Sequence, residues 1–130
     1  MKRWSTYVGC AMTLLVTVLI IFFSLEPKEA VPVVASWLPF ADKIGHLLAY
    51  AALGFSLGLW FRHRPSYPGK AITYALILGV SMELLQPYFQ RTRDGGDVVA
   101  DLLGTVAGLC FLALLERLVF LTRNKRTHVE

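Results

Sequence analysis

The chain has 130 residues, of which 55% are hydrophobic and only 17% are charged. This composition is too apolar for an ordinary soluble domain of that length and indicates a membrane protein. A membrane-spanning helix needs about 20 apolar residues, so the chain has room for about four spans and none for a separate soluble domain. The net charge of +4 comes from basic residues at the chain ends and in one loop, which is typical of a membrane orientation signal and not of a nucleic-acid surface.

Four apolar runs predict an all-α fold, a four-helix transmembrane bundle that forms a single membrane domain over residues 1–130. The spans are expected at Tyr7–Leu25, Asp42–Phe61, Ala71–Phe89 and Asp97–Leu121. The first run follows a basic start that resembles a signal peptide. It is 19 residues long, longer than the usual hydrophobic core of a signal, and no A-x-A-like site follows it. We therefore expect a retained first helix.

The loop after the first span contains Pro27, Pro32 and Pro39, which exclude a regular helix throughout. Its Trp37, Leu38 and Phe40 predict a segment that lies along the membrane interface, where tryptophan is favoured.

Both cysteines stand inside apolar runs. Neither Cys10 nor Cys110 belongs to a CxxC pair or to a Cys/His cluster with zinc spacing. We expect two buried thiols and no disulfide.

The distribution of Lys and Arg predicts the orientation of the bundle. Nine of these residues fall at the two termini and in the second loop, and four fall on the opposite side, namely Lys28, Lys43, Arg91 and Arg93. The positive-inside rule then predicts that both termini are cytoplasmic, including the basic tail 122–130, and that the first and third loops lie outside.

The second span has a polar and small residue at every fourth position. Asp42, His46, Tyr50, Gly54 and Gly58 are each four apart, so they share one helix face. Asp42 is expected to cap this helix, with His46 about 6 Å below it. A purely structural reading is also open, in which His46 bonds a neighbouring carbonyl and the glycines allow close helix contact.

The third span carries an acid at depth. Glu83 and Gln86 share a helix face, and Glu83 lies roughly 9 Å from the end of the span at Phe89. A lone acid there costs on the order of 2–3 kcal/mol, so it should face protein or water and have a partner. Pro87 lacks an N–H and leaves the carbonyl of Glu83 without its helical partner.

The fourth span opens on two acids and continues with two glycines. Asp97 follows a Gly-Gly pair and is expected to cap the helix at the favourable end of its dipole. Asp101 lies one turn deeper, where capping does not explain it. Gly104 and Gly108 form a GxxxG face that would hold Asp101 against a neighbouring span.

Because successive spans alternate in direction, the polar residues of three separate segments meet at one membrane face. We call this predicted set the polar cup; its members are Asp42, Lys43, His46, Tyr50, Glu83, Gln86, Arg91, Asp97 and Asp101.

These residues carry a resemblance to a known family. The segments DKIGHLLAY and ELLQ, followed by Arg91, Asp97, Asp101, Gly104 and Gly108, together resemble the VanZ-like proteins over about residues 39–108. Membership would imply a small, multi-pass protein of the bacterial cytoplasmic membrane. The family is named after a factor associated with resistance to the glycopeptide teicoplanin, which implies a role at the cell envelope. The chain departs from the family at Asp101, where the family usually has asparagine.

Several functions fit this pattern. The polar cup could bind the head group of an envelope lipid or glycolipid without catalysis, with Lys43 and Arg91 facing anionic oxygens. It could instead serve a membrane enzyme, in which His46 acts as a base or the acids Asp42, Glu83, Asp97 and Asp101 join it around a divalent metal.

The cup could also be a structural cluster in a protein whose function depends on a partner, and a proton-coupled transporter is a fourth alternative. No HExxH or GxSxG motif occurs, and we assign no cofactor and no resident metal. The expected partners are a membrane lipid or an envelope glycolipid, a second copy of the chain or another membrane protein, and no nucleic acid.

Overall fold

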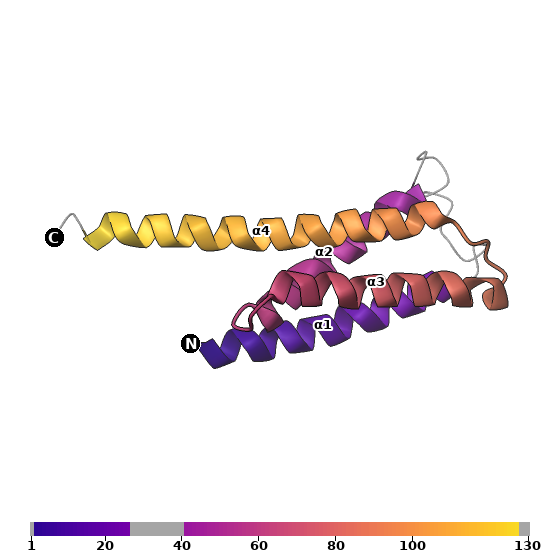
Figure 1. Ribbon diagram of the computed structural model, residues 1–130, viewed down its shortest axis with the longest axis horizontal. Coiled ribbons are helices and arrows are strands. Elements are labelled where there is room, and N and C mark those ends of the chain that lie inside the picture. The colour runs from indigo at the N-terminus through magenta and orange to yellow at the C-terminus, as the bar shows by residue number, and fades with distance from the viewer. Residues whose placement is uncertain (1, 27–40, 128–130) are drawn as a thin grey trace.

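The computed structural model describes residues 2–26 and 41–127, and within these ranges it is helical without strands. The helices are α1 (Lys2–Leu25), α2 (Ala41–Phe61), α3 (Tyr67–Leu85) and α4 (Gly95–Thr127), and a short 3-10 helix, η3 (Gln86–Phe89), continues α3 (Figure 1). Each of the four long helices is long and apolar enough to cross a membrane. The predicted four-helix bundle is therefore confirmed, and the chain has the build of a multi-pass membrane protein.

The predicted boundaries differ from the observed ones at several ends. Helix α1 begins before Tyr7, and α4 continues past Leu121 to Thr127. The third span is divided into α3 and η3, because Pro87 lacks the N–H that a continuous α-helix would need. The predicted interfacial segment with Trp37, Leu38 and Phe40 lies outside the described residues.

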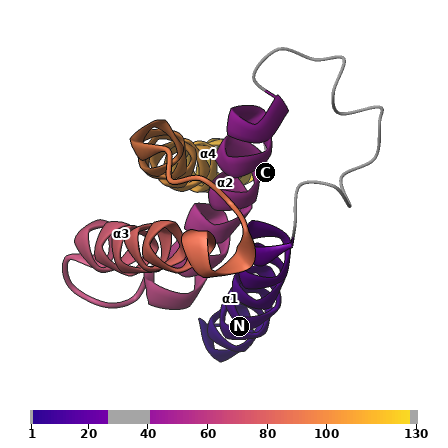
Figure 2. The same cartoon turned by 90° about the vertical axis from the view of Figure 1, so that its right-hand side faces the viewer.

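The helices alternate in direction, as Figure 1 shows. The last turn of α1, the first turns of α2 and α4, and η3 therefore lie at the same end of the bundle, which we call the acidic end. At the opposite end α4 extends beyond the other helices (Figure 1). Viewed from the acidic end, α2 lies between α1 and α4 (Figure 2), and it packs against every other long helix.

The α2–α4 seam is the closest helix contact, and glycines form it. A Cβ on Gly104 would collide with the backbone of Leu47, and one on Gly108 would collide with the backbone of Ala51. From the other side, Gly54 lies directly against the backbone of Thr105. The structure thus places these predicted packing glycines where the two backbones touch, and it places Gly58 against Leu109 and Leu112 of α4.

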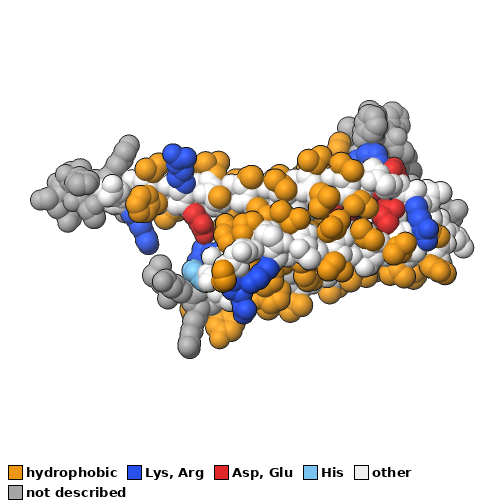
Figure 3. All heavy atoms as spheres, viewed as in Figure 1, with side chains coloured by type: hydrophobic (Ala, Val, Ile, Leu, Met, Phe, Trp, Pro, Cys, Tyr) orange, Lys and Arg blue, Asp and Glu red, His pale blue; other side chains and the backbone are white. Residues whose placement is uncertain are grey.

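The protein core is small, and most apolar side chains face outward. Leu53 and Leu57 of α2 are fully buried among Ile20, Ala71, Ala75 and Leu109 of the other helices. Figure 3 shows apolar side chains over the middle of the visible face, with Lys and Arg toward its two ends. This pattern is what a bundle surrounded by lipid requires, because the hydrocarbon region then covers the apolar belt.

The prediction of two buried thiols is wrong. Cys110 is exposed on the outer side of α4 and Cys10 is only half-buried; both are free. An apolar run around a cysteine places it in the membrane, but it does not decide whether the thiol faces protein or lipid.

Candidate functional site

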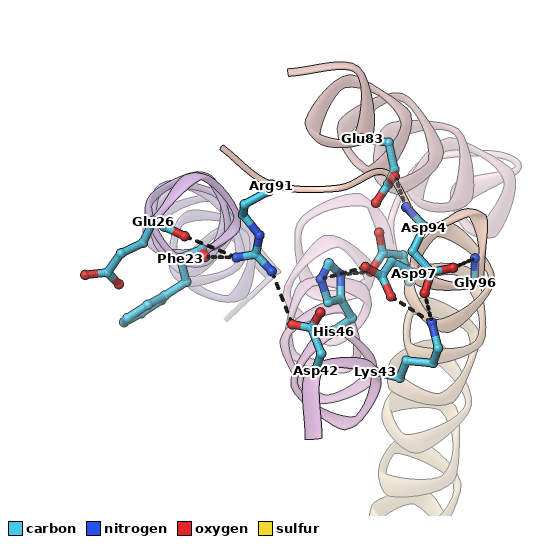
Figure 4. Close-up of polar contacts among 11 residues, drawn as sticks. Phe23, Glu26, Asp42, Lys43, His46, Glu83, Arg91, Asp94, Gly96 and Asp97 are labelled. Carbon is cyan, nitrogen blue, oxygen red and sulfur yellow. Dashed lines mark hydrogen bonds and ion pairs between the residues drawn. The ribbon is translucent and has the colours of Figure 1, made fainter. Parts of the chain in front are cut away.

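Residues from α2, α3, α4 and the turn after η3 meet at the acidic end. Asp42, Lys43 and His46 come from the first turns of α2, Glu83 from the end of α3, and Asp97 and Asp101 from the start of α4. The predicted convergence of three separate segments is present in the structure (Figure 4). The functional role of these residues stays a prediction.

The helix caps differ from those expected. Helix α4 begins at Gly95, so Asp97 lies inside its first turn, and Asp94 is the residue that caps it. The Asp94 carboxylate accepts the N–H of Gly96 at 2.8 Å, and its carbonyl accepts the N–H of Asp97 at 2.8 Å. Asp42 likewise lies within the first turn of α2, which begins at Ala41. Both Asp97 and Asp42 therefore direct their carboxylates into the site instead of capping a helix.

His46 lies between two carboxylates of α4. Its Nδ1 is 2.8 Å from Oδ1 of Asp101, and its Nε2 is 3.7 Å from Oδ2 of Asp97. The first distance is a hydrogen bond and the second is too long for one. When Nδ1 carries the proton and donates it to Asp101, Nε2 presents a lone pair toward Asp97.

Lys43 bridges Asp94 and Asp97 at the rim of the site. Its Nζ donates to Oδ2 of Asp94 at 2.5 Å and to Oδ1 of Asp97 at 3.1 Å. The Lys43 side chain is 36% exposed, whereas that of Asp97 is 4% exposed. Lys43 therefore covers Asp97 from the aqueous side.

Arg91 anchors the turn after η3 to two other helices. It donates through Nη1 to the carbonyls of Phe23 and Glu26 at the end of α1, and through Nη2 to Asp42 at 3.3 Å. Its side chain is only 5% exposed. Because Arg91 is buried and paired within the protein, its geometry argues against the expectation that it faces an anionic head group, whereas Lys43 stays partly exposed.

Glu83 has the hydrogen-bond partner expected for an acid at this depth, but only one of its two carboxylate oxygens is paired. Its Oε2 accepts the backbone N–H of Asp94 at 2.9 Å, and this ties α3 to the start of α4. Its Oε1 is buried and has no hydrogen-bond partner among the described residues. Gln86, which is 1% exposed, likewise has both side-chain amide atoms unpaired within the described part of the chain.

Tyr50 and Asp101 meet against a glycine of α3. A Cβ on Gly79 would lie 2.8 Å from Oδ2 of Asp101 and 3.5 Å from the Tyr50 hydroxyl. Tyr50 is 1% exposed, and its hydroxyl has no hydrogen-bond partner among the described residues. Gly79 thus leaves the space into which these two polar side chains extend.

The site is acceptor-rich and negative. Its five carboxylates, on Asp42, Glu83, Asp94, Asp97 and Asp101, exceed the two permanent cations, Lys43 and Arg91. Such a surplus favours a ligand that carries hydroxyl or ammonium donors, or a cation, over a purely anionic one.

Two residues of this site were not anticipated. Asp94 is not a member of the predicted polar cup, yet it caps α4, binds Lys43 and donates its N–H to Glu83. Gly79 stands four residues before Glu83 and so shares its helix face; this spacing is the signal that could have identified it.

The fold and the site together define a multi-pass helical membrane protein with a buried cluster of acids at one end. Comparison with protein-family models, with curated proteins and with solved structures finds no match to this chain.

Proposed function

We propose that this chain is a VanZ-like protein of a bacterial cytoplasmic membrane, and that its polar cup binds the head group of an envelope lipid or glycolipid. The observation that carries the proposal is the set of buried polar atoms at the acidic end that lack partners among the described residues, on Glu83 and Gln86. An unpaired buried polar group costs about 1–3 kcal/mol, and a ligand that supplied the missing hydrogen bonds would recover that cost.

The charge of the cup supports a head group rich in donors. The carboxylates of Glu83, Asp97 and Asp101 accept hydrogen bonds, so they suit the hydroxyls of a sugar or the ammonium of an ethanolamine. Lys43, on the exposed rim, is the residue placed to meet a phosphate oxygen of the same lipid. A sugar or ethanolamine head group is thus better supported than a simple anionic one.

We also propose that the polar cup lies at the outer face of the membrane. With nine Lys and Arg residues toward one face and four toward the other, the positive-inside rule directs the cup outward, to the face where envelope components are displayed. A relation to teicoplanin resistance belongs to the same proposal and is tested by comparing teicoplanin sensitivity with and without the gene.

The direct test is lipid-dependent stabilisation of the purified chain. Phosphatidylethanolamine, phosphatidylglycerol and a glycosyl diacylglycerol would each be added to protein in detergent, and the melting temperature would be measured. We expect the glycolipid or the ethanolamine lipid to raise it, and Glu83→Gln to reduce the effect. Glu116→Gln is the matched control, because Glu116 is exposed at the opposite end and pairs with Arg62 there. Equal responses to all three lipids would contradict the proposal.

A second candidate is a membrane enzyme, favoured by the His46–Asp101 pair. A histidine oriented through Nδ1 by a carboxylate presents Nε2 as a general base, the arrangement found in many hydrolases. The substrate would be a lipid-linked ester or amide that reaches the same cup. Turnover of such a lipid by the wild type, lost in His46→Ala, would favour catalysis over binding alone.

A further inference from the structure

Three side chains of the acidic end lie close enough together to be candidate ligands of one ion. Asp42 and His46 stand one turn apart on α2, and Asp97 faces them from α4. One ligand atom of each lies within 4.8 Å of the other two. Hydrogen bonds among the three do not explain this convergence, since His46 Nε2 and Asp97 Oδ2 are 3.7 Å apart.

The orientation of His46 suits metal binding. In protein metal sites, the ring nitrogen of histidine that does not bind the metal usually donates to a carboxylate or a carbonyl. Oδ1 of Asp101 accepts a hydrogen bond from Nδ1–H of His46 in that manner, which leaves Nε2 of His46 directed toward Asp97. Two ligands on one ion with bonds of about 2.0–2.1 Å lie roughly 3.0–3.4 Å apart, so Nε2 and Oδ2 would need to move by only a few tenths of an ångström.

A separate observation points to a ligand at the same place. Glu83 extends from α3 toward the side chains of α2 and α4 (Figure 4), where its Oε2 accepts the backbone N–H of Asp94. It is 8% exposed, and its Oε1 has no hydrogen-bond partner among the described residues. A buried carboxylate oxygen that faces further carboxylates needs a proton or a cation nearby.

We propose that Asp42, His46 through Nε2, and Asp97 bind one divalent transition-metal ion, with Zn²⁺ the best match. Mixed imidazole and carboxylate ligands suit Zn²⁺ better than Mg²⁺ or Ca²⁺, which favour oxygen alone. Asp101 orients His46, and the ion would offset the charge of the nearby buried carboxylate of Glu83. The side chain of Asp42 is 48% exposed and opens the site to the aqueous phase. This inference goes beyond the proposed lipid binding and does not depend on it.

The test is Zn²⁺ titration of the full chain in detergent, with any affinity tag removed and the protein first treated with a chelator. We expect one Zn²⁺ per chain by calorimetry, weak binding of Mg²⁺, and a visible ligand-field spectrum with Co²⁺. His46→Gln and Asp97→Asn, which remove a proposed ligand, should each weaken Zn²⁺ binding more than Asp101→Asn does, for which a loss of about 10-fold is expected. His63→Gln is the matched control, since His63 is exposed beyond the far end of α2 and should bind as the wild type does.

Failure of the wild type to bind one Zn²⁺, or unchanged binding by His46→Gln, would overturn the proposal. Circular dichroism identifies variants that do not fold. Asp42→Asn provides a further test at a half-exposed position, with at least about 10-fold weaker Zn²⁺ binding expected. Lipid stabilisation measured on chelator-treated protein separates the two proposals, because a chain without a metal site could still bind its head group.

Discussion

His46 of α2 and Asp101 of α4 are joined across the helix interface by a hydrogen bond of 2.8 Å between Nδ1 and Oδ1. The seam beside them sets this distance. Gly104, one turn below Asp101, lies against the backbone of Leu47, the residue that follows His46. The small residues of α4 therefore bring the two backbones close enough for a short acid to reach the imidazole.

Asp101→Ala should destabilise the bundle by about 1–3 kcal/mol, because it leaves the buried Nδ1–H of His46 without an acceptor. Asp101→Asn should cost less, since its side-chain carbonyl can accept the same hydrogen bond. Denaturant unfolding in detergent, followed by circular dichroism, measures both variants. Equal stability of the alanine variant and the wild type would show that this hydrogen bond contributes nothing.

Gly104→Ala should destabilise the chain by about 1–3 kcal/mol through overpacking of the α2–α4 seam. The added Cβ would meet the carbonyl of Leu47, and the backbone there cannot yield as a flexible side chain would. Gly45→Ala is the control within the same pair of helices, because a Cβ at Gly45 meets nothing within 4 Å. It should be neutral or stabilising by up to about 1 kcal/mol. Similar losses for the two variants would mean that the seam is not tightly packed.

Arg91→Lys should loosen the connection between α1 and the turn after η3. The guanidinium reaches the carbonyls of Phe23 and Glu26 and the carboxylate of Asp42 at once, and a single ammonium cannot span these acceptors. We expect a loss of about 1.5–3 kcal/mol, with faster hydrogen exchange at the end of α1. Arg93→Lys serves as the comparison, since Arg93 makes one exposed bond of 3.4 Å to the carbonyl of Leu84. If both variants exchange like the wild type, the buried guanidinium is not an anchor.

The sequence predicts the number and direction of the helices, because these depend only on the length and polarity of the segments. Four apolar runs require four helices, and their alternating direction brings Asp42, Glu83 and Asp101 to one end. Spacing by four residues also predicts which face of α2 is polar. These features follow from helix geometry alone, so no contact between distant segments needs to be known.

The finer parts of the site depend on such contacts. Asp94 and Asp97 are both reasonable caps by type, and only the backbone path of the turn shows that Asp94 caps α4. The partner of Glu83 is an amide eleven positions further along the chain, and hydrophobic patterns carry no information about it. The outward position of Cys110 could not be predicted, because α4 is apolar on every side over this stretch and periodicity does not identify its buried face.

The orientation of the bundle can be tested independently of any ligand. The positive-inside rule predicts that the Arg91–Asp94 turn lies outside the cytoplasm and the Arg62–Lys70 loop within it, because nine of the thirteen Lys and Arg residues lie toward the latter face. An alkaline phosphatase fusion after Arg93 should therefore be active and one after Arg64 inactive, while green fluorescent protein fusions should show the reverse fluorescence. Alkaline phosphatase activity from the Arg64 fusion, with none from the Arg93 fusion, would show that the polar cup faces the cytoplasm. An envelope component displayed on the outer leaflet could then not reach it, whereas the proposed Zn²⁺ site would remain open to test.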